Sequence, residues 1–300
     1  MRIVHLDTGR ELRGGQRQLL LLAQGLADRG HQQVILARKG SALWRECARL
    51  GLDARPLRNL GGEAAQADVV HSHDARAHSL AVLAASDKPL VVSRRVAFPP
   101  GAGMLSRWKY QRASRYLAVS EYVKAQMTAA GVAAEKISVV YDGVRLPSPD
   151  SAAPRERLVV APATEDPRKG SALATEACRA AAVQLQFSRD LDKDLPRAAL
   201  FLYLSHSEGL GSAILLAMAN RTPVVASRVG GIPEIVEHQR TGLLVDNDAG
   251  AIGAAIRLSL DDPATAGERA EAAYRQVHER FTDAIMVAET ESSDRLALQS

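Results

Sequence analysis

The sequence predicts an α/β protein with two Rossmann-like parallel-sheet domains, and three observations lead to this prediction. Its 300 residues are enough for two domains, and its hydrophobic content of 46% is enough to fill two cores. Short apolar runs alternate with stretches of helical spacing, as expected for buried parallel strands joined by helices. The aromatic content of only 4% disfavours a β-sandwich, whose strands need aromatic and β-branched side chains.

The first half of the chain contains the pattern of one such domain. Between its first two apolar runs, Leu19, Leu22, Ala23 and Leu26 keep helical spacing, and Gly30 provides the stop. The six apolar runs are residues 3–6, 34–37, 69–71, 90–92, 117–119 and 137–140. We therefore assign residues 1–147 to an N-terminal Rossmann-like domain with a doubly wound parallel sheet.

A proline-rich passage then predicts a linker. Pro147, Pro149 and Pro154 fall within residues 146–157, where they rule out a continuous helix or a central strand. Five further apolar runs predict a second, smaller sheet, and the residues from Ala249 onward are helical in pattern. These runs are residues 158–161, 183–187, 199–204, 223–227 and 242–245. The second domain is therefore expected to comprise residues 148–300, including the terminal helices.

Several classes of protein do not fit the sequence. The two cysteines, Cys47 and Cys178, lie far apart, so neither a disulfide framework nor a zinc-ligand spacing is present. The first apolar run is broken at once by Asp7 and Arg10, unlike a signal peptide or membrane span, and we expect a cytoplasmic protein. No Ser-His-Asp pattern, metal-binding carboxylate pair or Walker lysine loop occurs, so we expect metal-independent chemistry without a cofactor.

Positive charge is concentrated in one stretch, although the net charge of +4 is modest and we expect no nucleic-acid partner. The stretch contains Arg94, Arg95, Arg107, Lys109, Arg112 and Arg115. It could bind phosphate. Because a Pro-Pro-Gly break precedes a predicted helix with Leu105, Trp108 and Tyr110, the stretch could also contact an anionic membrane, such as the inner face of the plasma membrane. A solvated basic face is the third interpretation.

One loop carries the strongest chemical signal. Residues 207–212 read Ser-Glu-Gly-Leu-Gly-Ser and stand between an apolar run and the helical run 213–219. Glycines let a backbone approach a ligand closely, and free N–H groups at a helix start favour a diphosphate. Glu208 is expected to accept hydrogen bonds from sugar hydroxyls, because a carboxylate does not bind phosphate. The candidate donor-binding residues here are Gly209, Leu210, Gly211 and Ser212. An isolated Gly-x-Gly is more often an ordinary turn.

Two more loops strengthen this interpretation. Residues 229–234 follow a predicted strand and contain Gly230, Gly231 and Glu234, which we expect to enter a helix and bind the donor. Upstream, Arg168 and Lys169 precede another helix, where the Lys169 ammonium can meet a phosphate. The carboxyl ends of neighbouring parallel strands share one edge, so the three loops are expected to converge on one crevice.

Together with five passages of the first domain, these loops resemble the retaining glycosyltransferases of family 4 (group 1). The five passages are Gly14-Gly15, residues 26–34, residues 67–73, residues 118–120 and residues 139–144. The resemblance runs through nearly the whole chain and implies the GT-B fold of two Rossmann-like lobes. It implies a nucleotide-sugar donor bound mainly by the second lobe, and a saccharide or glycolipid acceptor on the side of the first.

The resemblance also implies roles for individual residues. Lys169 contacts the donor diphosphate, Glu208 holds the donor-sugar hydroxyls, and Gly14 with Gly15 lies near donor phosphate and acceptor. A retaining enzyme of this kind releases the diphosphate while the acceptor hydroxyl attacks from the same face. Electrostatic stabilisation of the leaving diphosphate is then the main catalytic effect.

Cationic and imidazole groups follow two strands of the first domain. Family members often place a histidine where this chain has Arg94 and Arg95, and we expect Arg95 to steady phosphate charge as a catalytic group and Arg94 to lie on the acceptor side. Alternation places His71 and His73 on one side of their strand. His73 is either an acceptor-side ligand or a turn residue. We interpret His5, His31, His206 and His238 as structural or exposed.

The chain departs from the family pattern at three places. Leu216 stands where a second glutamate commonly binds ribose, and Ala163 stands where a second basic residue binds phosphate, unless Arg168 replaces it. The passage 182–199 is too short for the usual strand–helix–strand, so the second lobe is expected to be abbreviated.

Two functions remain open at this point. The first is a hexosyl- or heptosyl-type transferase acting with retention on a glycolipid, lipopolysaccharide-core or polysaccharide acceptor. The second is a catalytically degenerate relative that binds a ligand or stabilises a partner, as the departures suggest. A nucleotide-sugar epimerase is a weaker third reading, because the carboxylate and histidine groups it needs are not found at suitable positions.

Overall fold

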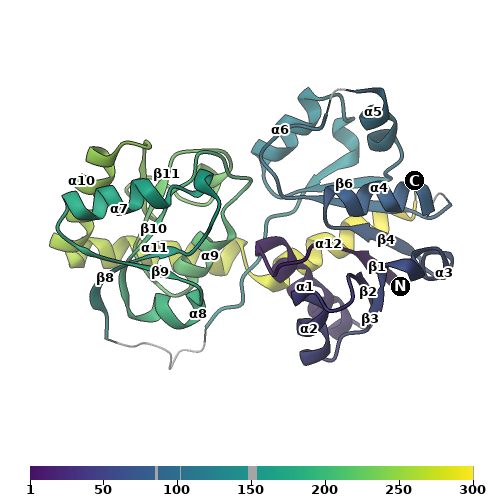
Figure 1. Ribbon diagram of the computed structural model, residues 1–300, viewed down its shortest axis with the longest axis horizontal. Coiled ribbons are helices and arrows are strands. Elements are labelled where there is room, and N and C mark those ends of the chain that lie inside the picture. The colour runs from purple at the N-terminus through teal and green to yellow at the C-terminus, as the bar shows by residue number, and fades with distance from the viewer. Residues whose placement is uncertain (85–86, 102, 148–153, 300) are drawn as a thin grey trace. The chain divides into compact units, whose positions relative to one another are not determined.

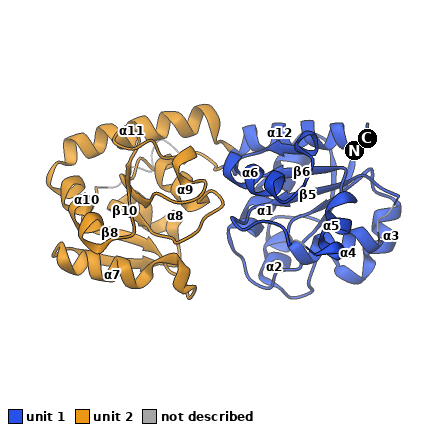
Figure 2. Ribbon diagram, turned by 90° about the horizontal axis from the view of Figure 1, so that it is seen from above, with its two compact units in different colours: residues 1–143, 283–300 blue, residues 144–282 orange. Residues whose placement is uncertain are grey.

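The computed structural model describes residues 1–84, 87–101, 103–147 and 154–299 of the chain. The chain forms two compact units (Figure 2). The first unit consists of residues 1–143 and 283–300, and the second of residues 144–282. The expected organisation into two parallel-sheet α/β domains is confirmed. Each unit is described by itself.

The first unit is built on a seven-stranded sheet in the order β3-β2-β1-β4-β5-β6-β7, with all adjacent pairs parallel (Figure 1). The strands are β1 (Arg2–Leu6), β2 (Gln32–Ala37), β3 (Ala54–Pro56), β4 (Val69–Ser72), β5 (Leu90–Arg94), β6 (Arg115–Ala118) and β7 (Ile137–Val139). Six of them correspond to the predicted apolar runs. The seventh, β3, was not predicted, because three half-buried residues at a sheet edge leave too little apolar pattern.

The helices of the first unit begin where short polar side chains can cap them. Ser41 accepts a hydrogen bond from Trp44 N at 3.2 Å, and Ser120 accepts one from Val123 N at 3.1 Å. The helices are α1 (Gly14–Asp28), α2 (Ala42–Arg49), α3 (Leu60–Ala65), α4 (Ala75–Ala84), α5 (Met104–Gln111), α6 (Glu121–Ala129) and α12 (Asp283–Ala297). Gly14 and Gly15 lie inside the first turn of α1 rather than in a loop before it.

The last helix, α12, packs on the first unit, although the sequence analysis placed it in the second domain. Met286 and Val287 join the same core cluster as Ile3 and Leu22. The close packing depends on Gly25, because a Cβ at that position would lie 2.5 Å from Val287 Cγ2. A helical pattern alone does not say which sheet a helix covers, so the partner surface was invisible in the sequence.

The second unit contains a five-stranded parallel sheet in the order β12-β11-β10-β8-β9. Its strands are β8 (Glu156–Pro162), β9 (Gln184–Ser188), β10 (Ala198–Tyr203), β11 (Val224–Ser227) and β12 (Leu243–Val245). Its α-helices are α7 (Ser171–Ala180), α8 (Leu191–Asp194), α9 (Ser212–Ala219), α10 (Ala249–Asp261) and α11 (Pro263–Arg280). All five strands match the predicted runs to within a few residues.

The boundary between the two units differs from expectation. The first unit ends at Gly143 and the second begins at Val144, whereas a boundary between 147 and 148 was expected; residues 148–153 of the predicted linker lie outside the described residues. The loop 229–234, which was expected to enter a helix, itself contains the 3₁₀ helix Ile232–Glu234, and no α-helix follows it before β12. Between β9 and β10, in the passage expected to be too short for strand–helix–strand, the chain forms the four-residue helix α8 and a 3₁₀ turn, Leu195–Arg197.

Candidate functional site

The end of β10 in the second unit holds the most connected group of predicted residues. Tyr203, the last residue of β10, donates its hydroxyl hydrogen to Glu208 Oε2 at 2.6 Å. Lys169 forms an ion pair with the same oxygen, and Gly209 N donates to Glu208 Oε1 at 3.2 Å. The carboxylate of Glu208 is thus held by three donors. The side chain of Lys169 remains 31% exposed and that of Glu208 13% exposed, so both are accessible to a ligand.

Burial sets the protonation state of the tyrosine in this group. Desolvation, followed by the neighbouring Glu208 carboxylate, raises the pKa of Tyr203 well above its ordinary value. The phenol therefore stays neutral and acts as a hydrogen-bond donor to Glu208. The Lys169 ammonium also lies 5.8 Å from the centre of the Tyr203 ring, within cation–π range.

The loop that carries Lys169 is tied to the end of β10 by its backbone. His206 N donates to the carbonyl oxygen of Arg168 at 2.9 Å. Gly170 has a φ of +65°, and a Cβ there would lie 2.7 Å from Leu204 Cβ. A glycine is required at this position both for the left-handed backbone and for the close approach. The loop therefore presents Lys169 to Glu208 in one arrangement.

A second glycine loop packs against the backbone of Glu208. Gly231 N donates to the Glu208 carbonyl oxygen at 3.2 Å, and a Cβ on Gly230 would lie 1.9 Å from that oxygen. Below these loops, Ser205 N donates to Ser227 Oγ at 3.0 Å, which joins the ends of β10 and β11. The three predicted glycine loops thus do meet at one edge of the second sheet.

Other predicted donor-binding residues lie around this group. Leu210 is buried, Gly211 takes a φ of +98° just before α9, and Ser212 begins that helix. Glu234 ends the 3₁₀ helix and is half-buried. Leu216, at the position where the family pattern has a glutamate, is half-buried on α9.

Arg168, predicted as a donor-binding residue, has its side chain on the surface. Its side chain is 70% exposed and pairs with Asp166 at 2.7 Å. The hydrogen bonds from Arg168 lower the pKa of Asp166 to about 2. The structure thus places Arg168 in a surface ion pair and leaves Ala163 without an evident cationic replacement among the described residues.

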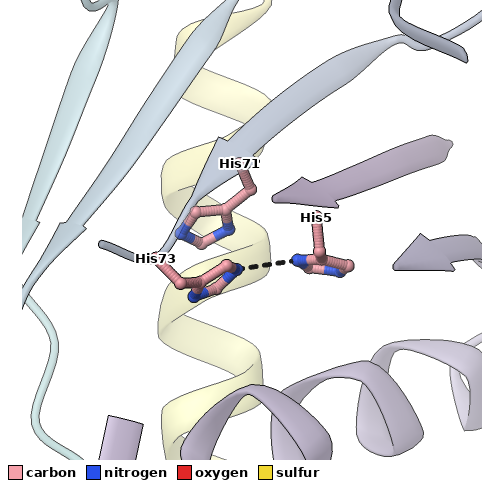
Figure 3. Close-up of side chains that lie close together, drawn as sticks. All are labelled: His5, His71 and His73. Atoms are coloured by element: carbon pink, nitrogen blue, oxygen red, sulfur yellow. Dashed lines mark hydrogen bonds between the residues drawn. The ribbon is translucent and has the colours of Figure 1, made fainter. Parts of the chain in front are cut away.

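In the first unit, three histidines gather at the carboxyl ends of β1 and β4 (Figure 3). His5 and His71 are register partners on these neighbouring strands, and His73 follows two residues after His71. His5 Nδ1 lies 3.0 Å from His73 Nε2, and the rings of His71 and His73 stack with centroids 4.2 Å apart. We call His5, His71 and His73 the histidine cluster. His5 and His71 are fully buried, and His73 is 7% exposed.

In His5 and His71, the ring nitrogen Nε2 has a polar neighbour. His5 Nε2 lies 2.7 Å from Gln33 Oε1, and His71 Nε2 lies 2.8 Å from Ser93 Oγ. Burial lowers the pKa of His5 to about 4, against the effect of its hydrogen bond to Gln33. Burial, and secondarily the neighbouring histidines and Arg95, also lowers the pKa of His71 and His73 well below the usual value. All three imidazoles are therefore neutral near pH 7.

Arg95, which was predicted to steady phosphate charge, lies beside this cluster. Its Nε donates to Asp142 Oδ1 at 3.0 Å, and its Nη1 lies 3.5 Å from His73 Nδ1. A Cβ on Gly15 would lie 4.0 Å from Arg95 Cδ, so the start of α1 adjoins the same side chain. The structure thus brings the predicted residues Gly15, His73 and Arg95 together.

Arg94 points elsewhere and does not join His73. Its Nη1 donates to Tyr110 Oη at 2.7 Å, its Nη2 donates to the Phe98 carbonyl oxygen, and only 7% of the residue is exposed. Arg94 ends β5 and Arg95 follows it, and the two guanidinium groups have different partners, so they do not serve the same site. The geometry gives Arg94 the task of holding Phe98 and Tyr110, with a pKa lowered by burial.

Sequence reasoning missed several polar residues here. Asp7 accepts hydrogen bonds from Gly9 N at 2.8 Å and Gln16 Nε2 at 3.0 Å, and burial raises its pKa. Asp74 accepts from Thr8 Oγ1 at 2.9 Å and caps α4. His5 was interpreted as structural or exposed, yet it contacts His73. The available signal was position, since His5, Asp7 and Asp74 all stand at or after the carboxyl end of a strand.

Two family profiles match the chain. The profile described as Glycosyltransferase Family 4 matches residues 12–146, and the profile described as Glycosyl transferases group 1 matches residues 153–276. Among curated proteins, N-acetyl-alpha-D-glucosaminyl L-malate synthase of Bacillus anthracis is 37% identical over 102 residues, or 33% of this chain and 26% of that protein. D-inositol 3-phosphate glycosyltransferase of Arthrobacter sp. FB24 is 49% identical over 70 residues, or 23% of this chain and 17% of that protein. The matches thus span about a quarter or less of these relatives.

Solved structures resemble the whole chain. The Anabaena protein HepE in complex with UDP has a TM-score of 0.82 at 19% identity, covering 98% of this chain and 100% of that one. A glycosyltransferase from Rickettsia africae ESF-5 has a TM-score of 0.83 at 17% identity, covering 100% of this chain and 99% of that one. At such low identity, these similarities describe the fold.

Proposed function

We propose that this chain, which belongs to the family 4, group 1 glycosyltransferases with the GT-B fold, transfers a sugar from a nucleotide-sugar donor to a saccharide or glycolipid acceptor. The observation that carries this proposal is the grouping of Lys169 and Glu208 at the end of β10 by three glycine loops. A cation for the diphosphate and a carboxylate for sugar hydroxyls are the two groups that a nucleotide sugar needs. The HepE structures with UDP and with UDP-glucose support a donor of this class.

On the donor side, the proposed catalytic effect is mainly electrostatic stabilisation of the leaving diphosphate. Lys169 meets the diphosphate and neutralises the charge that grows as it leaves, while Glu208 accepts hydrogen bonds from hydroxyls of the transferred hexose or heptose. The N–H groups of Leu210, Gly211 and Gly230 face the donor in this proposal, because those of Gly209 and Gly231 already donate to Glu208. No metal ion takes part in the transfer, because Lys169 and the backbone donors supply the positive charge.

In the acceptor part of the proposal, His73 and Arg95 orient the acceptor. A neutral imidazole at this position can hydrogen-bond the attacking hydroxyl, and the Arg95 guanidinium is fixed by Asp142 at 3.0 Å. The hydroxyl attacks from the face that the diphosphate leaves, so the anomeric configuration is retained. Arg94 is not part of this proposal, because its guanidinium is committed to Tyr110 and Phe98.

A glycolipid or lipopolysaccharide-core acceptor is supported by an apolar, basic surface on α5. Met104 is 87% exposed, Leu105 83% and Trp108 42%, and Arg112 stacks on Trp108 at 5.2 Å. Exposed apolar side chains with adjacent cations are suited to an anionic membrane surface. No described helix is long and apolar enough to cross a bilayer. We place the protein in the cytoplasm, in peripheral contact with the inner membrane face.

The test is turnover of a nucleotide-sugar panel, including slow donor hydrolysis, by wild type and Glu208→Gln. We expect Glu208→Gln to lose most turnover, while Glu176→Gln, an exposed carboxylate on α7, stays at the wild-type rate. Product stereochemistry read by NMR decides retention. Equal turnover of wild type and Glu208→Gln would contradict the proposed role of the carboxylate.

A binding protein without transferase activity is the second candidate. Leu216 on α9 leaves no carboxylate at the position where the family pattern binds ribose, and the chain between β9 and β10 is short. This candidate predicts weak or no nucleoside diphosphate binding by calorimetry together with no donor loss from any nucleotide sugar. Turnover with any donor of the panel would exclude it.

A further inference from the structure

The spacing and burial of the three imidazoles in the histidine cluster resemble those of a metal-binding site. One nitrogen from each ring lies within 4.8 Å of one from each of the others, and all three side chains are buried. One polar atom of the cluster is unsatisfied: His71 Nδ1 is buried with no hydrogen-bond partner among the described residues. A buried polar atom without a partner costs free energy, which an ion at this position would recover.

We propose that His5, His71 and His73 form a binding site for a divalent transition-metal ion of the zinc class. Imidazole is the side chain that Zn²⁺, Cu²⁺ and Ni²⁺ share as a preferred ligand. In a tetrahedral zinc site with Zn–N distances of about 2.1 Å, ligand nitrogens lie roughly 3.3–3.5 Å apart. The 3.0 Å between His5 Nδ1 and His73 Nε2 is already close to this spacing.

The surroundings of the cluster match those of metal-binding histidines. Such histidines usually engage the ring nitrogen that does not face the metal in a hydrogen bond, which fixes the tautomer. Here Gln33 Oε1 lies 2.7 Å from His5 Nε2, and Ser93 Oγ lies 2.8 Å from His71 Nε2. If His71 Nε2 donates to Ser93 Oγ as His5 Nε2 donates to Gln33 Oε1, Nδ1 of His71 carries a lone pair, and Nδ1 of His5 becomes a ligand atom once its contact with His73 Nε2 is broken.

Metal binding requires a local rearrangement at His73. The rings of His71 and His73 are stacked, so the His73 ring must turn for both lone pairs to reach one ion. If the ion takes His73 Nε2, the ring hydrogen moves to Nδ1, where it faces the Arg95 guanidinium at 3.5 Å. Metal occupancy is therefore coupled to the Arg95–Asp142 pair. Binding itself does not depend on the transfer reaction proposed above.

The experiment measures Zn²⁺ retained after dialysis of the full chain, without any nucleotide sugar. We expect one Zn²⁺ per wild-type chain. His71→Gln and His5→Gln should each bind Zn²⁺ at least about 10-fold more weakly, because losing even a residue that only hydrogen-bonds a metal ligand lowers metal affinity by about 10-fold or more. The paired control is His206→Gln with His278→Gln, two exposed histidines of the second unit, which should leave the stoichiometry unchanged.

Co²⁺ provides a second readout for the case in which the cluster variants fail to fold. A tetrahedral Co²⁺ site in the wild-type chain is expected to give a visible absorption band that Zn²⁺ removes and the exposed-histidine control retains. Zn²⁺ binding that is equal in wild type and folded His71→Gln, or the absence of the Co²⁺ band in wild type, would overturn the proposal. Neither result bears on whether the chain turns over a nucleotide sugar.

Discussion

Gly230 lies directly against the backbone of Glu208, with room for a hydrogen but not for a methyl group. A Cβ at residue 230 would lie 1.9 Å from the Glu208 carbonyl oxygen, and the φ of Gly230 is +56°. The position of the Glu208 carboxylate at the mouth of the second sheet therefore depends on a residue 22 positions later in the chain. This contact, together with the Lys169 ion pair, joins the three glycine loops.

Gly230→Ala should displace the Glu208 loop and lower donor affinity. The left-handed backbone alone costs about 1–2 kcal/mol for a residue with a Cβ, and the clash adds to it. Gly131→Ala is the matched control, because Gly131 has a φ of +88° with nothing within 4 Å of its Cβ position. Urea unfolding should show a larger loss for Gly230→Ala than for Gly131→Ala. Equal losses would mean that the Glu208 loop adapts without cost.

Lys169→Met should weaken binding of nucleoside diphosphates. A charge-assisted hydrogen bond contributes about 1.5–3 kcal/mol, so the dissociation constant should rise on the order of 10- to 100-fold in calorimetry. Lys193→Met, on the exposed side of α8, should leave the affinity unchanged. An unaltered dissociation constant in Lys169→Met would show that the ammonium serves only its ion pair with Glu208.

Asp294 should make the first unit less stable as pH rises. It is fully buried on α12 with no hydrogen-bond partner among the described residues, and burial, then the nearby Glu291, raises its pKa to about 8. The unfolded chain releases this proton near its ordinary pKa of about 4, so stability is lost between roughly pH 4 and pH 8.

Asp294→Asn should remove this dependence, because an amide does not ionise, and the free energy of unfolding at pH 8 should rise relative to wild type. Urea unfolding at pH 5 and pH 8 measures it, with Asp28→Asn on exposed surface of α1 as the control. The same pH dependence in wild type and Asp294→Asn would rule out Asp294 as the titrating group.

Leu105→Glu should reduce binding to vesicles containing anionic lipid. Burying one leucine in the interface contributes about 1.5–3 kcal/mol, so the partition coefficient should fall on the order of 10-fold. Leu258→Glu is the control, since Leu258 is 55% exposed on α10 of the second unit. If both variants sediment with vesicles as wild type does, the α5 surface is not a membrane contact.

Periodicity predicted the fold well because parallel strands buried on both faces must be apolar over their whole length. That requirement is local, so the six runs of the first half and the five of the second were visible without any contact information. It fails for β3, whose three residues are all half-buried. Periodicity also did not place α12, because a sequence shows which face of a helix is apolar but not which sheet that face packs against.

In the candidate site too, some features were visible in the sequence and others depend on the tertiary structure. The meeting of Lys169, Glu208 and the glycines around them could be predicted, because each of their loops follows a strand of one parallel sheet. The different partners of Arg94 and Arg95 emerge only in the tertiary structure, and the contact of His5 with His73 follows from the register of β1 against β4. Ladder register and helix docking join residues far apart in the chain. Spacing along the sequence therefore identifies the chemistry present, while the pairing of strands sets which groups meet.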